Sequence, residues 1–288
     1  MTAAIFLATF LNSASTFAAT HIWFQPWSST HELADVLASV PEGRAVLDAA
    51  KKVDPHFLDL VEPDNSSFTE NTVAGTYKPF EGDGGRLRQK TKIHLKRKLP
   101  LSDAAADLSH ELLHFAKRKL LDPFEGEFEL KKYVLQGIEG EGGELEAFEN
   151  ECKVAAALEK SDPAFPRHRY CERYSKDGIF QKEKARSDYY ALGKWMPNAD
   201  TALKTAFPSM NDQPVAFSSG MSGKPYPISF AEEFARARKA ACETNRWRFR
   251  VAAEKTKRRK HAVADMYIAE LEKIRGFHTK NCRGIPLP

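Results

Sequence analysis

Residues 100–123 read PLSDAAADLSHELLHFAKRKLLDP, and this stretch organises the chain around it. After its first residue no glycine or proline interrupts it until Pro123, so the stretch predicts one continuous helix up to Leu121. Ser102 is placed to cap the start of this helix, and Asp122-Pro123 closes it.

The two sides of this predicted helix differ in chemistry. Leu108, Leu112 and Phe115 fall on one side of a helical wheel, whereas His110 and His114 point in nearly the opposite direction. We therefore expect one face to pack against a hydrophobic core and the other to border a cleft.

His110 and His114 form the pattern His-Glu-x-x-His, which places two imidazoles one turn apart on the same helix face, where both can bind one zinc ion. Glu111 lies between them, where its carboxylate can take a proton from zinc-bound water. The plainer interpretation is that both histidines belong to a solvated helix face. A zinc site needs a third protein ligand, which the surrounding sequence must supply.

Glu144 is the predicted third ligand. Two glycines precede it, and the apolar spacing after them predicts a helix from Glu144 through Leu158. Glu144 falls within the apolar arc of this helix, whereas Glu146 and Glu149 point to solvent. A carboxylate on a buried face must be paired or bound to a metal, because an isolated buried charge is costly. The alternative is that Glu144 simply occupies the first helical turn, where the helix dipole favours it.

These residues resemble the gluzincin class of zinc metallopeptidases, in which an E-x-x-[SA] segment on a second helix follows the His-Glu-x-x-His motif. Here the matching segment is Glu144-Leu145-Glu146-Ala147, and the resemblance covers residues 90–155. It implies a zincin-like core in which His110, His114 and Glu144 hold one Zn²⁺ per chain. It also implies that Glu111 is the general base.

The chain departs from the gluzincin pattern at Phe148, where many members carry an acidic residue that hydrogen-bonds a zinc-bound histidine. By helical position, Asp107 and Glu151 are the two candidates for that role. The reaction also requires an oxyanion donor. The sequence offers four candidates and does not choose among them: Tyr133, His168, Tyr170 and Tyr174.

Residues 91–99 alternate apolar and cationic side chains and predict a half-buried strand. Such a strand could pair with an extended peptide. Lysines at a sheet edge are equally typical of an edge that is protected against aggregation. Residues 71–77 form a second predicted strand, and a glycine-rich turn at 81–85 separates the two. The fold class is therefore α+β and predominantly helical, with a small antiparallel sheet.

Residues 1–19 carry no charged side chain, contain a short apolar stretch and end in small residues, which is typical of a secretory signal peptide. The apolar stretch is too short for a membrane span, and no other segment is long and apolar enough to form one. We therefore expect a secreted or periplasmic protein with no membrane span.

The cysteines support the same expectation. They show no Cys-x-x-Cys spacing, so they favour two disulfides over a second metal site. Of the three possible pairings we expect the local one, which joins Cys152 to Cys171 and Cys242 to Cys282. The alternative is four reduced, buried cysteines.

The remaining chain indicates how the protein is organised. We expect a zincin-like catalytic region at 20–160 and a helical C-terminal region at 161–288 packed on it, with helical character at 177–195 and a long helix at 229–274. The net charge of +4 specifies no partner. The basic run at 255–260 has no interleaved aromatic residues, so we expect no nucleic-acid partner.

The sequence thus predicts an exported zinc-dependent hydrolase, in the first place a metallopeptidase acting on a peptide or protein substrate. One alternative is a cell-wall (peptidoglycan) amidase or endopeptidase with the same zinc chemistry. Another is a non-catalytic exported binding protein with a vestigial metal site. The intact Glu111 argues against the vestigial site, because a scaffold needs no base. The sequence does not indicate the cleavage specificity, whether cleavage is endo or exo, or the oligomeric state.

Overall fold

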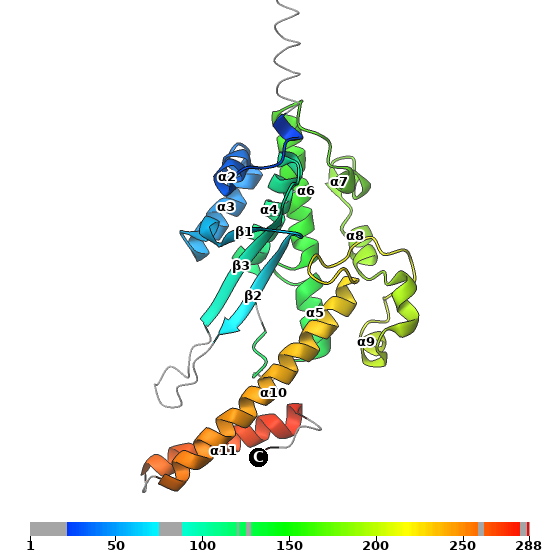
Figure 1. Ribbon diagram of the computed structural model, residues 1–288. Helices are drawn as coiled ribbons and strands as arrows, with labels where there is room; N and C mark the ends of the chain where they lie inside the picture. The colour runs from blue at the N-terminus through cyan, green and yellow to red at the C-terminus, as the bar shows by residue number, and fades with distance from the viewer. Residues whose placement is uncertain are drawn as a thin grey trace, which may run out of the picture.

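The computed structural model describes residues 22–74, 88–119, 121–124, 128–258 and 262–282, together with Leu287. The predicted signal peptide and the glycine-rich turn lie outside these residues. The described chain is an α+β fold in which a small sheet lies against a larger set of helices (Figure 1).

The N-terminal half supplies the sheet and the helices that cover it. Its elements are α2 (Thr30–Ala38), α3 (Pro41–Val53), the 3-10 helix η1 (Phe57–Leu60), β1 (Val61–Asp64), β2 (Phe68–Ala74), β3 (Arg88–Lys96), α4 (Leu101–Lys117) and α5 (Leu130–Ile138). Ser29 caps α2 by accepting a hydrogen bond from the backbone of Glu32, and Pro41 begins α3.

The sheet has the order β1–β3–β2 and is mixed, which corrects the prediction of an antiparallel sheet. β2 pairs with β3 antiparallel, but β1 pairs with β3 in parallel. The sequence rules missed β1 because it is short and contains Pro63, which is tolerated only at a sheet edge such as the one β1 occupies. β2 and β3 each begin three residues before the predicted strands at 71–77 and 91–99.

α4 differs from the predicted helix at both ends. Pro100 occupies the N-cap position, and Ser102 lies buried in the first turn, where its hydroxyl donates to the carbonyl of Trp23. Ser102 therefore does not cap the helix. The helix ends at Lys117, earlier than predicted, because Arg118 adopts an extended backbone conformation.

α6 (Glu144–Ser161) contributes to both hydrophobic clusters of the fold. Val154 and Leu158 pack with residues of α2, α3 and α4 in the first cluster. Leu145 and Phe148 pack with residues of α5 and α8 (Lys182–Tyr189) in the second. α6 lies alongside α4, so the histidine-bearing face of α4 and the start of α6 meet (Figure 1).

The region predicted to be helical at 177–195 begins instead with a short hairpin. The elements between α6 and α10 are α7 (Arg169–Arg173), β4 (Ser175–Lys176), β5 (Ile179–Phe180), α8, the 3-10 helix η2 (Gly193–Asn198) and α9 (Thr201–Ala206). The hairpin turns at Asp177-Gly178, where both residues have positive φ angles. Such a turn interrupts the helical pattern that the side chains suggest.

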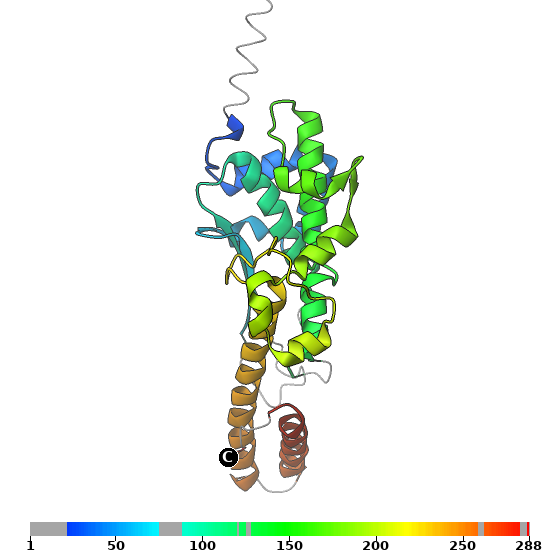
Figure 2. The same ribbon diagram turned by 90° about the vertical axis from the view of Figure 1, so that its right-hand side faces the viewer.

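The long helix predicted at 229–274 is two helices, α10 (Tyr226–Arg258) and α11 (Ala262–Asn281). They pack against each other as a hairpin that projects from the rest of the fold (Figures 1 and 2). Asn245 on α10 donates a hydrogen bond to the carbonyl of Ile274 on α11. None of the described helices combines the length and apolar character that a bilayer span requires.

Candidate metal centre

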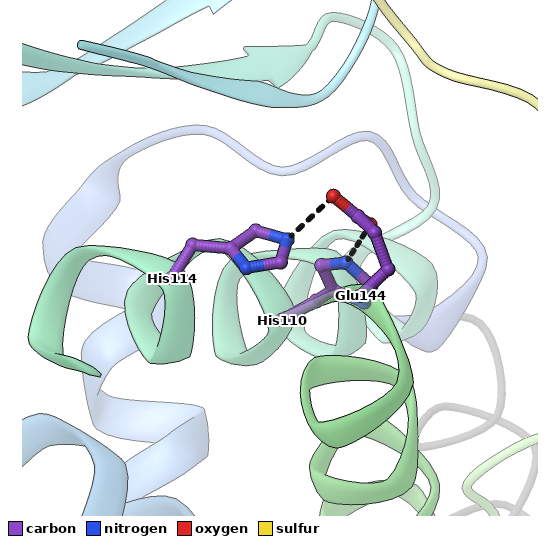
Figure 3. A group of neighbouring side chains, drawn as sticks. All are labelled: His110, His114 and Glu144. Carbon is purple, nitrogen blue, oxygen red and sulfur yellow. Dashed lines mark hydrogen bonds and ion pairs between the residues drawn. The ribbon is translucent and has the colours of Figure 1, made fainter. Parts of the chain in front are cut away.

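The three predicted ligands meet between α4 and α6 (Figure 3). His110 and His114 project from α4, and Glu144 is the first residue of α6. Nε2 of His110 lies 3.4 Å from Oε2 of Glu144, and Nε2 of His114 lies 3.4 Å from Oε1 of the same carboxylate. One ligand atom from each residue lies within 4.8 Å of the other two, a spacing that one cation could bridge with bonds of about 2 Å.

The loop before α6 brings Glu144 to the histidines. Gly142 has a φ angle of 66°, and a Cβ atom there would lie 2.4 Å from the backbone nitrogen of Arg118. Only glycine allows this conformation and this close approach without strain. The loop therefore packs directly on the end of α4, and α6 begins beside the face that carries the histidines.

Each histidine is held through Nδ1, which leaves Nε2 directed at Glu144. Nδ1 of His110 lies 2.9 Å from Oε2 of Glu151, and Nδ1 of His114 donates to the carbonyl of Gly142 over 2.8 Å. Partners of this kind fix the orientation of a ligand imidazole. The sequence indicated Glu151 as a candidate for this contact, but a backbone carbonyl carries no sequence signal.

His114 and Glu144 present two hydrogen-bond acceptors to each other. Because Nδ1 of His114 donates to Gly142, Nε2 of the neutral ring carries a lone pair. Burial, with the help of Arg118, lowers the pKa of His114 to about 4, so the ring is neutral at neutral pH. A lone pair and a carboxylate oxygen 3.4 Å apart repel each other unless a cation lies between them. This donor set therefore fits a divalent metal ion.

His110 and Glu144 form a charged pair in the metal-free protein. Burial disfavours the charged imidazole, but the hydrogen bonds with Glu144 and Glu151 outweigh burial and raise the pKa of His110. Burial also disfavours the charged carboxylate, yet the hydrogen bond with His110 and the charge of Arg118 hold the pKa of Glu144 well below its ordinary value. Metal binding would release the extra proton of His110, because a ligand imidazole must be neutral.

Arg118 holds the other side of the same carboxylate. Its Nη2 lies 2.8 Å from Oε1 of Glu144 and donates to the carbonyl of Gly137 over 3.1 Å. This contact directs Oε1 to the guanidinium and leaves Oε2 facing His110. Glu144 is thus oriented by the protein before any ion binds.

Glu111 is buried beside the cluster and is oriented by the sheet. Its Oε2 accepts a hydrogen bond from Oγ1 of Thr69 on β2 over 2.7 Å. Burial, reinforced by Glu144, raises the pKa of Glu111 to about 7. A carboxylate with this pKa can take up and return a proton near neutral pH. Sequence reasoning missed Thr69, because the contact arises only when β2 joins the sheet above α4.

Asp107, the other candidate partner for a ligand histidine, contacts the sheet instead. Its Oδ2 accepts a hydrogen bond from Oγ of Ser67 over 2.6 Å. Burial and the neighbouring Glu151 raise the pKa of Asp107 to about 6. Asp107 therefore ties α4 to the start of β2 and lies one turn before His110.

The four predicted oxyanion donors lie in different surroundings. Tyr133 lines a cavity beside Glu111, whereas His168 and Tyr170 line a second cavity on the other side of the cluster. Tyr174 is buried in the second hydrophobic cluster and donates its hydroxyl to the partly buried carboxylate of Asp188. The structure does not bring Tyr174 to the metal cluster.

Tyr226, which sequence reasoning missed, lies beside the cluster. Burial, reinforced by the charge of Glu144, raises the pKa of Tyr226 well above its ordinary value. It is also the aromatic residue that borders both cavities. The only sequence signal was its place at the start of α10, after a proline-rich loop, which by itself indicates no role.

Two cavities flank the cluster, and residues 216–221, which we call the strap, run between them. The smaller cavity, of about 100 Å³, is bordered by Glu111, and the larger, of about 890 Å³, is bordered by His110. The first three strap residues line the larger cavity and the last three line the smaller one. A Cβ atom on Gly220 would lie 2.3 Å from the carbonyl oxygen of Ser67, so the strap rests directly on the backbone before β2.

The structure confirms both predicted disulfides, Cys152–Cys171 and Cys242–Cys282. The first joins α6 to α7 and the second joins α10 to the end of α11. Glu151, His168 and Cys171 also approach one another closely enough to suggest a metal site. Because the sulfur of Cys171 is bonded to Cys152, this group lacks a thiolate ligand and does not form a second centre.

Comparisons of the chain with protein-family models, with curated proteins and with solved structures gave no significant match. The gluzincin resemblance and the zincin-like core stay predictions from the motif. The described geometry therefore carries the functional argument by itself.

Proposed function

We propose that the protein is a zinc-dependent hydrolase and that its substrate is a peptide bond. One observation carries the metal: Nε2 of His114 and Oε1 of Glu144 face each other as two acceptors, with Nε2 of His110 beside them. Two imidazoles and one carboxylate are the ligand set of many catalytic zinc sites, which keep one position open for water or substrate.

The surrounding residues supply the acid–base chemistry. Bound zinc would polarise the scissile carbonyl and lower the pKa of a bound water molecule. Glu111, oriented by Thr69, would accept a proton from a water molecule beside it and return that proton to the leaving amine. The hydroxyl of Tyr226 is available to stabilise the oxyanion, because Tyr226 lies near Glu144 and borders both cavities.

A peptide substrate is favoured by the position of β2. This strand is at an edge of the sheet, lies beside Glu111 and lines the smaller cavity through Phe68 and Asn71. An extended peptide can add to such an edge by main-chain hydrogen bonds. The same geometry also accepts the peptide stem of a cell-wall polymer, which is the alternative substrate. An intact and oriented Glu111 favours both over a vestigial binding site.

The two disulfides are typical of proteins from an extracellular or otherwise oxidising compartment. They support the proposal that the protein acts after export. The signal peptide predicted at residues 1–19 lies outside the described residues and remains part of this proposal.

The experiment that tests the proposal measures metal content and peptide hydrolysis in parallel. We expect about one zinc per molecule in the wild type and a loss of zinc in His110→Ala. Glu111→Gln should keep the zinc but lower kcat by about 10²–10⁴, because an amide cannot accept the proton of the water. Casein-derived peptides and purified muropeptides, assayed side by side, separate the two substrate classes.

Glu149→Gln is the matched control for Glu111→Gln. Glu149 lies on α6 and pairs with Lys153 at the surface, so its loss should change neither zinc content nor turnover. Unchanged zinc content in His110→Ala would refute the metal centre. Full turnover in Glu111→Gln would show that another group is the base.

A further inference from the structure

We infer that the smaller cavity binds a lysine or arginine side chain of the peptide next to the scissile bond, and that Glu233 selects its positive charge. The inference rests on the proposed function, since it assigns a substrate preference to the same site. It concerns a part of the cavity that the proposed chemistry leaves unused.

The cavity has the size and position of a side-chain pocket. Its volume of about 100 Å³ is enough for one long side chain. Glu111 and His114 border one end, so a side chain entering there belongs to a residue beside the reacting carbonyl. Phe230 and Met221 contribute apolar walls, which suit the methylene stem of lysine or arginine.

α10 places Glu233 at a distance from the cluster that matches such a side chain. Tyr226, Phe230 and Glu233 all line the cavity, and their spacing places them on one face of the helix. Seven residues of helix correspond to about 10 Å between Tyr226, which lines the cavity together with Glu144, and Glu233. An extended cationic side chain whose backbone lies at the cluster can therefore bring its charge near Glu233.

The other charges of the cavity are already engaged. Glu111 accepts from Thr69, and Glu144 is bound by Arg118 and the histidines. The charge of Arg118 also acts on Glu233, but Nη2 of Arg118 binds Glu144 and a backbone carbonyl. The Nζ atom of Lys119 lies 2.7 Å from Glu141, and both of these side chains are mostly exposed to solvent.

Glu233 has only a more distant cationic neighbour in the cavity, because Arg118 acts on it without forming an ion pair. Tyr133, a neutral residue, lines the same cavity, and burial together with the charge of Glu233 raises the pKa of Tyr133. Among the residues that the structure describes, Glu233 forms no ion pair within 4 Å. An apolar side chain filling the cavity would strip water from this carboxylate without replacing it, which is costly. A lysine or arginine side chain would supply the missing charge partner.

The test measures the specificity of the zinc-loaded full chain on peptides that vary at one position beside the cleaved bond. We expect the wild type to prefer lysine or arginine over leucine at that position. Glu233→Gln should lower kcat/KM for the basic peptides about 10- to 100-fold and leave the leucine peptide nearly unchanged. Glu233→Lys should abolish cleavage of the basic peptides and retain cleavage of the leucine peptide.

Glu232→Gln is the matched control, because Glu232 lies next to Glu233 on α10 but pairs with Lys224 outside this cavity. It should keep the wild-type preference. A wild type without basic preference, or a preference that survives in Glu233→Gln, would overturn the inference.

A second measurement separates this inference from the proposed function. NMR titration of the zinc-free protein with benzamidine should show binding to the wild type and to Glu232→Gln, and at least tenfold weaker binding to Glu233→Gln. If no peptide is hydrolysed, the proposed function is wrong. The titration still shows whether the smaller cavity binds a cation through Glu233. Equal binding of benzamidine to the wild type and Glu233→Gln would refute the pocket in either case.

Discussion

Glu144 is the residue on which the centre depends, because it faces both histidines and Arg118 at once. Its acidic neighbour Glu146 lies two residues on and is turned away. Glu146 pairs with Lys117 and accepts a hydrogen bond from the backbone of Gly142. The two carboxylates are therefore close in sequence but differ completely in what they contact.

We predict that Glu144→Ala loses zinc binding and hydrolysis, whereas Glu146→Ala retains most of both. Removing Glu144 deletes a ligand and also leaves the buried guanidinium of Arg118 without its partner, so we also expect the metal-free protein to lose about 3–5 kcal/mol of stability. Glu146→Ala should cost about 1 kcal/mol or less, since its pair with Lys117 is partly exposed. Equilibrium dialysis against zinc and urea unfolding measure the two effects.

The opposite ranking in zinc affinity would show that the ligand is misassigned. A large stability loss in Glu144→Ala with unchanged zinc affinity would make the His–Glu–Arg cluster a structural network rather than a metal centre. Zinc-free protein is needed for the stability measurement, because bound metal adds its own binding free energy to folding.

At the scale of single residues, the sequence was enough to predict those residues whose role follows from their spacing within one helix or motif. His110, His114 and Glu144 were found from a motif and a helical wheel, and the structure brings them together. Thr69 and Tyr226 were missed, because their contacts join segments that are far apart in the chain. No periodicity within one element can indicate such a contact.

At the scale of elements, the loop between α5 and α6 determines where the ligand helix begins. Gly142 combines a positive φ angle, close packing on Arg118 and a carbonyl that holds His114. A side chain at this position must push α6 away from α4. The geometry of the centre therefore depends on a residue that supplies no ligand atom.

We predict that Gly142→Ala destabilises the zinc-free protein by about 2–4 kcal/mol and weakens zinc binding, because it adds both a clash and backbone strain. Gly178→Ala is the matched control: Gly178 also has a positive φ angle, but a Cβ atom there meets nothing within 4 Å. It should cost about 1 kcal/mol and leave zinc affinity unchanged. Urea unfolding and zinc titration check both variants, and equal effects would contradict this account.

Element boundaries were less predictable than element types. Helices around Glu111 and Glu144 were expected from apolar spacing, and both exist. The cap at Ser102 was wrong, because that hydroxyl is buried against Trp23 in the folded protein. α4 also ends earlier than predicted, and β1 was not predicted. Both features depend on tertiary contacts, which the secondary-structure propensity of the local sequence does not show.

At the scale of the whole molecule, the α+β class and both disulfides were predicted, and the arrangement of the C-terminal half was not. Amphipathic spacing is continuous through most of residues 229–274, so it indicated one helix. The observed hairpin of α10 and α11 brings Cys282 to Cys242 instead. Chain reversal of this kind depends on contacts between the two helices.

The strap has a topological consequence for what can enter the site. It is continuous with the rest of the chain at both ends, rests on Ser67 through Gly220, and separates the two cavities that flank the cluster. A polypeptide that occupies both cavities must thus thread beneath it or wait until it lifts. Either route admits a loose, extended chain far more readily than a folded domain.

We therefore expect a disulfide-bonded protein substrate, such as native ribonuclease, to resist cleavage until it is reduced and unfolded. Gly220→Val, which displaces the strap from Ser67, should narrow that difference in rate. Equal cleavage of the native and the unfolded substrate by the wild type would show that the strap is no barrier. The protein would therefore select its substrate first by whether that substrate is unfolded, and only then by its side chains.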